Sequence, residues 1–181
     1  KEVFYNVLAP ALAAILERYE KVEVQIIGHF KLPAILERFA DRIFVVQFIN
    51  NFREYLEQLK RADINIAILE KTVFTDCKSE IKWLEAAAFG IPSVLTPTEL
   101  YSFLLRDGEE ALFASSMADW VRALGQLIED APLRERIGRR ACAKAFSGYG
   151  PGVGKACAEN ILKGHLPVLS PRKRKRILMV N

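Results

Sequence analysis

The sequence predicts an α/β fold built on a doubly wound, Rossmann-like parallel sheet in a single domain. Two observations predict it. Short apolar runs alternate with helical segments between residues 22 and 96, which is the rhythm of βαβ units. The chain also has 181 residues, of which 51% are hydrophobic, which suffices for one substantial core and hardly for two.

The predicted elements follow one another with short connections. We expect strands at 22–27, 43–49, 64–69, 93–96 and 111–114, and helices at 10–19, 31–40, 51–61, 80–89, 99–105, 117–129, 132–146 and 153–163. Gly28 and His29 form a turn directly after the first strand. Turns at the carboxyl ends of parallel strands line ligand sites in open α/β sheets, so this turn is a candidate binding element.

The stretch from Thr75 to Pro97 contains a loop, a helix, a glycine stop and a strand. Ser79 is a capping-type residue, and we expect it to accept a hydrogen bond from the first turn of the helix at 80–89. Gly90 can adopt the left-handed conformation that ends a helix, and Pro92 cannot continue one. The apolar run at 93–96 suits a buried strand.

Charge and cysteine content exclude several classes of protein. The net charge is +4, but five of the 26 basic residues lie at 172–176, which leaves 21 against 22 acidic residues. A nucleic-acid-binding protein would spread its basic residues over a face, so we expect no nucleic-acid partner. Cys77, Cys142 and Cys157 lack any CxxC spacing, which predicts neither disulfides nor a zinc site. No apolar run approaches the roughly 20 residues that span a bilayer, and we expect a soluble, cytoplasmic protein.

Glu85 is the main candidate for ligand binding. Its carboxylate lies one to two turns into the predicted helix at 80–89, whose amino end faces the carboxyl edge of the sheet. In that position it can accept both hydroxyls of a ribose, while the helix start holds phosphate and Lys78 adds positive charge. The alternative is a solvated or ion-paired glutamate with no ligand. The residues alone leave both interpretations open.

The motif E-A-A-A-F-G-I-P from Glu85 to Pro92 resembles that of retaining GT-B glycosyltransferases of the group 1 type, in their nucleotide-sugar-binding, C-terminal half. The resemblance covers roughly residues 3 to 146. It departs from the family pattern at Cys77, where a glutamate is usual, and at Lys78 and Ser79, where many members have Pro-Phe-Gly. Some relatives carry a K-S-x-x-K-x-x-E version of this loop, which the present sequence matches.

The resemblance implies a donor-binding domain that takes a nucleotide-diphosphate sugar and serves its transfer to a glycan, lipid or polysaccharide acceptor. It implies that Glu85 binds the ribose, that Lys78 and Ser79 lie near the diphosphate, and that Glu80 or backbone groups replace the glutamate missing at Cys77. The implied donor-binding residues are Glu85, Lys78, Ser79, Glu80, Lys82, Gly28, His29 and Asn50. It implies no metal, no cofactor besides the donor and no identifiable catalytic residue.

Two other functions remain open at this point. A catalytically inactive binding or scaffold module would retain the fold, and Cys77 in place of the usual glutamate favours it. A nucleotide-binding domain of another kind, such as a sugar epimerase of similar architecture, is the second alternative.

We also predict how the chain is divided into a domain, a linker and a terminal strand. We expect a donor-binding domain at 1–165, a basic linker at 166–176 and a strand at 177–181. The chain resembles a piece of a larger enzyme whose N-terminal half binds the acceptor, so we expect the fragment alone to be inactive. The full-length protein is expected to associate with membranes peripherally, if at all.

We expect the opening strand of the fold to be missing from this sequence, and hence a vacant sheet position between 24–27 and 66–69. We expect residues 176–180, whose apolar run at 177–180 suits a buried strand, to fill that position, either within one chain or swapped between the subunits of a homodimer. A frayed chain end is the alternative.

Overall fold

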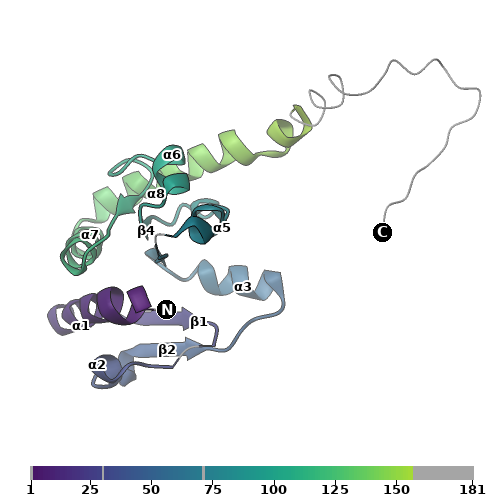
Figure 1. The fold of residues 1–181 in the computed structure, drawn as a ribbon. Helices are drawn as coiled ribbons and strands as arrows, with labels where there is room; N and C mark the ends of the chain where they lie inside the picture. Colours follow the sequence, from purple (N-terminus) through teal and green to yellow (C-terminus); the bar gives the residue numbers. More distant parts are fainter. Residues whose placement is uncertain (1, 30, 71, 157–181) are drawn as a thin grey trace, which may run out of the picture. The chain divides into compact units, whose positions relative to one another are not determined.

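The computed structural model describes residues 2–29, 31–70 and 72–156 (Figure 1). The chain divides into a first unit, residues 1–146, and a second unit, residues 147–181. In the described part of the second unit, residues 151–156 are helical. The predicted linker at 166–176 and the predicted strand at 177–181 lie outside the described residues.

The first unit alternates helices and strands, and its last helix continues to Tyr149. In chain order the elements are η1 (Phe4–Leu8), α1 (Ala9–Arg18), β1 (Val24–Ile27), α2 (Ala34–Glu37), η2 (Ala40–Arg42), β2 (Ile43–Val46), α3 (Phe52–Leu59), β3 (Asn65–Ala67), α4 (Val73–Asp76), α5 (Ile81–Ala87), β4 (Ser93–Leu95), α6 (Glu99–Leu104), β5 (Leu112–Phe113), α7 (Met117–Glu129) and α8 (Ala131–Tyr149).

All strand pairs are parallel, as the βαβ rhythm predicts. Strand β1 pairs with β2, with Val24 opposite Ile43, and β4 pairs with both β3 and β5. Among the described residues no strand pairs with both β1 and β3, so the strands form a two-stranded and a three-stranded sheet. This division falls where the sequence predicts a vacant sheet position.

The three-stranded sheet is covered on both faces, which makes the fold doubly wound. Neighbouring strand residues point to opposite faces, and Val94 and Leu95 enter two different cores. The first core combines Val94 with residues of α1 and α7, and it also includes Val24 and Ile26 of β1. The second core combines Leu95 with residues of α5, α6 and α8. The predicted Rossmann-like class is therefore confirmed.

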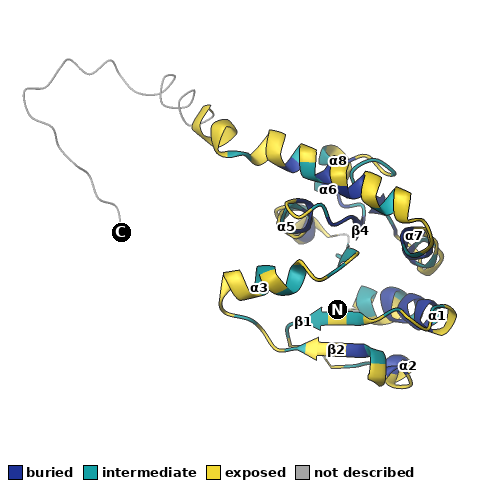
Figure 2. Cartoon of the chain, turned by 180° about the vertical axis from the view of Figure 1, so that it is seen from behind, coloured by how far each residue is buried: buried dark blue, intermediate teal, exposed yellow. Residues whose placement is uncertain are grey.

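Helix α3 is packed less deeply than its neighbours. None of its residues is buried, whereas α1 and α7 carry continuous buried stripes (Figure 2). Asn51 caps α3 by accepting hydrogen bonds from the backbone N–H groups of Arg53 and Glu54. On the side of the sheet, Gln58 of α3 accepts a hydrogen bond from Gln25 of β1 at 3.1 Å. Polar contacts thus take part in holding α3 in place.

Prolines account for two differences from the predicted elements. The helix expected at 31–40 is reduced to α2, because Pro33 is extended at its N-cap and a residue before proline avoids the helical region. Pro10 has no N–H to bond the carbonyl four residues back, and the chain before it forms the π-helix η1.

The loop before α5 also differs from the prediction. It contains the short helix α4, which is capped by Thr72. The N-cap of α5 is Glu80, without a side-chain capping bond, so the prediction that Ser79 caps this helix is wrong. Gly90 does follow α5 with a φ of +70°, as predicted for the glycine stop.

Candidate functional site

A cavity of about 500 Å³ opens at the carboxyl end of β3, where the chain leaves the sheet toward α5. Its apolar wall comes from β3 and the residues that follow it, and its polar wall from the loop before α5 and the start of that helix. The lining residues are Ile66, Ala67, Ile68, Leu69, Lys78, Ser79, Ile81, Lys82 and Tyr101. Three of the predicted donor-binding residues, Lys78, Ser79 and Lys82, therefore meet at one cavity.

The positive charges at this cavity have different surroundings. Lys78 is exposed, and its Nζ lies over the ring of Phe74, 5.2 Å from the ring centroid. Lys82 lies 4.9 Å over the ring of Tyr55, and its Nζ also donates to a carboxylate. Ser79 is exposed between the two lysines in the sequence. Two ammonium groups and a hydroxyl are suited to binding an anion such as phosphate.

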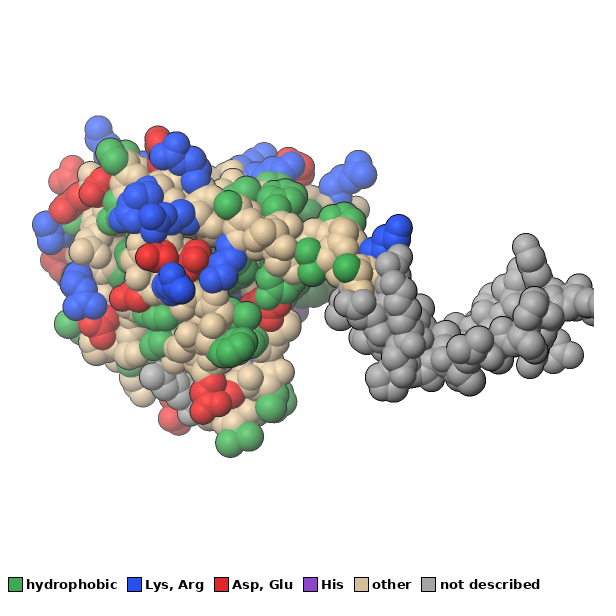
Figure 3. All heavy atoms as spheres, turned by 90° about the horizontal axis from the view of Figure 1, so that it is seen from above, with side chains coloured by type: hydrophobic (Ala, Val, Ile, Leu, Met, Phe, Trp, Pro, Cys, Tyr) green, Lys and Arg blue, Asp and Glu red, His purple; other side chains and the backbone are tan. Residues whose placement is uncertain are grey.

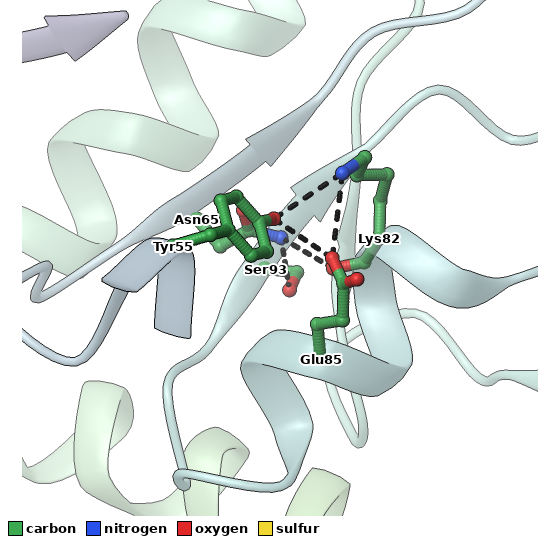
Figure 4. A network of polar contacts seen from close by, with 5 residues as sticks. All are labelled: Tyr55, Asn65, Lys82, Glu85 and Ser93. Atoms are coloured by element: carbon green, nitrogen blue, oxygen red, sulfur yellow. Dashed lines mark hydrogen bonds and ion pairs between the residues drawn. The ribbon is translucent and has the colours of Figure 1, made fainter. Parts of the chain in front are cut away.

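Glu85 lies behind Lys82 in a network of polar contacts (Figure 4). The Tyr55 hydroxyl donates to Glu85 Oε2 at 2.7 Å, and Lys82 Nζ donates to the same oxygen at 3.3 Å. Lys82 Nζ also donates to the Tyr55 hydroxyl at 3.2 Å, which closes a triangle. The Glu85 side chain is only 10% exposed and does not line the cavity. Its carboxylate is joined to the cavity wall through Lys82.

Burial and charge change the pKa values within this network. Burial raises the pKa of Tyr55, and the hydrogen bond to Glu85 raises it further. Burial alone would lower the pKa of Lys82, but its contacts with Tyr55 and the charge of Glu85 outweigh this effect and raise the pKa. Lys82 is therefore cationic and Tyr55 neutral throughout the physiological pH range.

Asn65 fixes the start of α5 against the sheet. Its Nδ2 donates to the carbonyl oxygen of Lys82 at 3.2 Å and to Ser93 Oγ at 3.0 Å (Figure 4). Both Asn65 and Tyr55 were missed, because their partners lie 17 to 30 residues away in the sequence and no local pattern marks them.

Tyr101 of α6 closes the cavity from the side of the second core. It is 2% exposed, and burial raises its pKa to about 12, with the nearby charge of Glu80 adding to the effect. A hydrogen bond with the backbone of Trp83 acts in the opposite direction. Glu80 thus influences a residue of the cavity wall without lining the cavity itself.

The remaining predicted residues come from the other sheet. Gly28 follows β1 with a φ of +129° and donates its N–H to the carbonyl of Val46, while His29 and Asn50 are exposed. These three residues do not line the cavity beside β3. A second cavity of about 400 Å³ is lined by residues after β3 and β4, namely Thr72, Val73, Asp76, Pro97, Thr98, Glu99 and Ser102.

The described residues contain no group of three or more His, Cys, Asp or Glu side chains that could hold a metal ion. Lys and Arg side chains on the face seen in Figure 3 are interspersed with Asp and Glu. Ion pairs on α8 include Arg140 with Glu109 and Lys144 with Glu110. Within the described part of the chain, every helix is too short or too polar to cross a membrane.

The doubly wound parallel architecture, with a cavity where the chain passes from a strand to the next helix, defines a Rossmann-like half-domain of the GT-B kind. The chain belongs to the glycosyl transferase-like family, whose family model matches residues 9–151. No curated protein matches the chain.

Solved structures support the assignment of the fold. The C-terminal domain of a glycosyl transferase group 1 family protein, LpcC from Francisella tularensis, shares 19% identity over 80% of this chain and 78% of that one, with a TM-score of 0.64. HepE from Anabaena, solved in complex with UDP and glucose, shares 16% identity over 87% of this chain, with a TM-score of 0.67. The present chain spans 44% of the HepE chain.

A third structure shows that the fold alone does not define the activity. It is a putative UDP-N-acetylglucosamine 2-epimerase from Listeria monocytogenes, with 15% identity over 86% of this chain and 40% of that one and a TM-score of 0.59. The half-domain therefore occurs in proteins whose names indicate different reactions.

Proposed function

We propose that this chain binds the nucleoside-diphosphate part of a sugar donor, and that the whole protein transfers the sugar to a glycan or lipid acceptor. The observation that carries the proposal is the cavity beside β3, where Lys78, Ser79 and Lys82 meet next to the carboxylate of Glu85. Membership of the glycosyl transferase-like family supports the reaction type. The UDP and glucose bound to HepE support the class of donor.

Each part of the donor has a matching group at the site. Lys78 and Ser79 contact the diphosphate, because an exposed ammonium and a hydroxyl can both donate to phosphate oxygens. Glu85 accepts the ribose hydroxyls, and burial of its side chain strengthens such bonds by excluding water. Gly28, His29 and Asn50 lie at the carboxyl ends of β1 and β2 and contact the nucleotide from the second sheet.

The sugar end of the donor is held differently from the family pattern. Cys77 is exposed after α4 and has no carboxylate to accept a sugar hydroxyl. Glu80, at the N-cap of α5, takes over this contact. Among the described residues at the site, no side chain is arranged as a nucleophile with a base. The departing phosphate of the donor therefore accepts the proton of the acceptor hydroxyl.

Substitution of Glu85 tests the donor assignment. Loss of a charge-assisted hydrogen bond at a largely buried carboxylate costs about 1.5–3 kcal/mol, so Glu85→Gln should weaken nucleotide binding at least about tenfold. Isothermal titration calorimetry with UDP, GDP and ADP measures the affinities. Glu54→Gln removes the same charge from an exposed position on α3 and should leave them unchanged. Equal affinity of wild type and a folded Glu85→Gln variant would exclude Glu85 from the site.

An inactive binding module is the second candidate function, and Cys77 is the observation that favours it. Restoring the family residue with Cys77→Glu distinguishes the two functions when the chain is joined to its acceptor-binding half. A binding module should show no transfer with either residue. An active transferase should transfer sugar with Cys77 in place.

A further inference from the structure

The carboxylate of Glu85 is held by a side chain from a different helix. Tyr55 lies on α3, thirty residues earlier in the chain, and its hydroxyl donates to Glu85 Oε2 at 2.7 Å (Figure 4). Lys82 reaches the same oxygen from α5 itself. All of these bonds end on Oε2, and among the described residues no group donates to Oε1. One oxygen is thus bound to the protein, and the other is left for a ligand.

Lys82 alone would fix this carboxylate poorly. It lies three residues before Glu85 on the same helix, its side chain is 59% exposed, and pairs of this kind are weakly held because both side chains move and water screens them. Tyr55 differs in having a rigid ring with only two side-chain torsions. Its ring packs under the Lys82 ammonium and stacks on Phe52, with ring centroids 6.2 Å apart. The Tyr55 hydroxyl is therefore held more rigidly than the Lys82 ammonium.

We propose that Tyr55 is a positioning residue for nucleotide binding: it anchors Oε2 of Glu85 so that Oε1 is directed toward the ribose hydroxyls. This inference rests on the proposed function, in which Glu85 binds the ribose. It assigns a binding role to α3, a helix with no buried residue. It also explains why α3, although none of its residues is buried, makes the short, partly buried hydrogen bond from Tyr55 to Glu85 of α5.

A purely structural role would be to tie α3 to α5. The carboxyl ends of the same two helices are also joined by Lys60, the C-cap of α3, and Phe89, which follows α5; the Lys60 Nζ lies 5.1 Å from the Phe89 ring centroid. This second contact involves neither Glu85 nor the cavity. It provides a matched control, since Phe89→Leu removes a contact between α3 and α5 without changing the carboxylate.

A double-mutant cycle on nucleotide binding tests the proposal. Calorimetry with UDP, GDP and ADP on the 181-residue chain compares wild type, Tyr55→Phe, Glu85→Gln, the double variant and Phe89→Leu. Tyr55→Phe keeps the ring and removes only the hydroxyl, so it should weaken binding about threefold to tenfold, the range of a net hydrogen-bond contribution. In the Glu85→Gln background the same change should cost less than about twofold, because the anchored carboxylate is already gone. Phe89→Leu should bind as wild type.

Three results would overturn the proposal. Unchanged affinity of Tyr55→Phe, with a melting temperature near that of wild type, would show that the hydroxyl does not position Glu85. An equal loss in the wild-type and Glu85→Gln backgrounds, or an equal loss in Phe89→Leu, would show that only the packing of α3 on α5 matters. Absence of nucleotide binding by wild type would instead refute the proposed function, and the inference with it.

Discussion

Two glycines meet where α8 crosses the turn after α5, and this contact excludes any side chain. A Cβ added to Gly138 would lie 1.9 Å from the carbonyl oxygen of Gly90 and 2.9 Å from its carbonyl carbon. Both partners are backbone, so neither can move aside as a flexible side chain would. Gly90 is itself held at a φ of +70°, which favours glycine. The close approach of α8 to this turn therefore depends on both residues.

Gly138→Ala should destabilise the protein by about 1–3 kcal/mol or more, as overpacking of a tight contact does. Gly148→Ala is the control, because it lies in the same helix and its Cβ would meet no atom within 4 Å. That substitution should be neutral or stabilising by up to about 1 kcal/mol, since alanine favours helix. Urea unfolding of both variants measures the difference. Equal stability of the two would contradict the close contact.

The sequence indicates which side chains line the cavity better than it indicates which tertiary hydrogen bonds they make. Lys78, Ser79 and Lys82 were predicted from a local motif, and they do line one cavity. Tyr55 was not predicted, because a tyrosine in an amphipathic helix carries no local sign that its hydroxyl bonds a glutamate thirty residues later. Such tertiary pairs depend on how helices pack.

At the scale of elements, the start of α7 is capped by two side chains, Ser116 and Asp119. Ser116 Oγ accepts the backbone N–H of Asp119 at 3.2 Å, and Asp119 Oδ2 accepts from the backbone N–H and the hydroxyl of Ser116 at 3.1 and 2.7 Å. These bonds, with the side-chain hydroxyl contributing most, lower the pKa of Asp119 from 3.8 to about 2. Ser116 and Asp119 thus form a reciprocal capping box at the start of this helix.

The lowered pKa of Asp119 makes part of the stability pH-dependent. The contribution is fully present above pH 3.8, the unfolded-state pKa, and is lost as the pH falls through about 2, the folded-state pKa. Asp119→Asn should therefore be less stable than wild type at pH 5, and the difference should shrink by pH 2. Urea unfolding at pH 5, 3 and 2 measures it, with the exposed Asp63→Asn as control. A difference that stays constant with pH would contradict the role of the carboxylate.

The order and type of most elements follow from the sequence, whereas their lengths do not. Periodicity identifies α5, α7 and α8 well, because each has an apolar face and clear end signals. The strands are shorter than predicted, since an apolar run does not reveal where pairing with a neighbour stops. A helix as short as α4 has too few residues to show a helical pattern of apolar residues, so the sequence does not predict it.

At the scale of the whole chain, family membership and fold agree on a GT-B half-domain with two helix layers around its three-stranded sheet. A predicted vacant position between β1 and β3 coincides with the division into two sheets. The residues predicted to occupy it, 176–180, lie outside the described part of the chain. The chain spans 44% of HepE, so the transfer reaction is a proposal for a longer protein.

The central claim is that the cavity beside β3 binds a nucleoside diphosphate. Calorimetric titration of the 181-residue chain with UDP, GDP, ADP and CDP tests it most directly. We expect saturable binding of at least one of them, with one site per chain and a lower affinity for the corresponding nucleoside, because Lys78 and Ser79 contact the diphosphate. No binding of any of the four at about 1 mM, equivalent to a binding free energy weaker than about 4 kcal/mol, would contradict the claim.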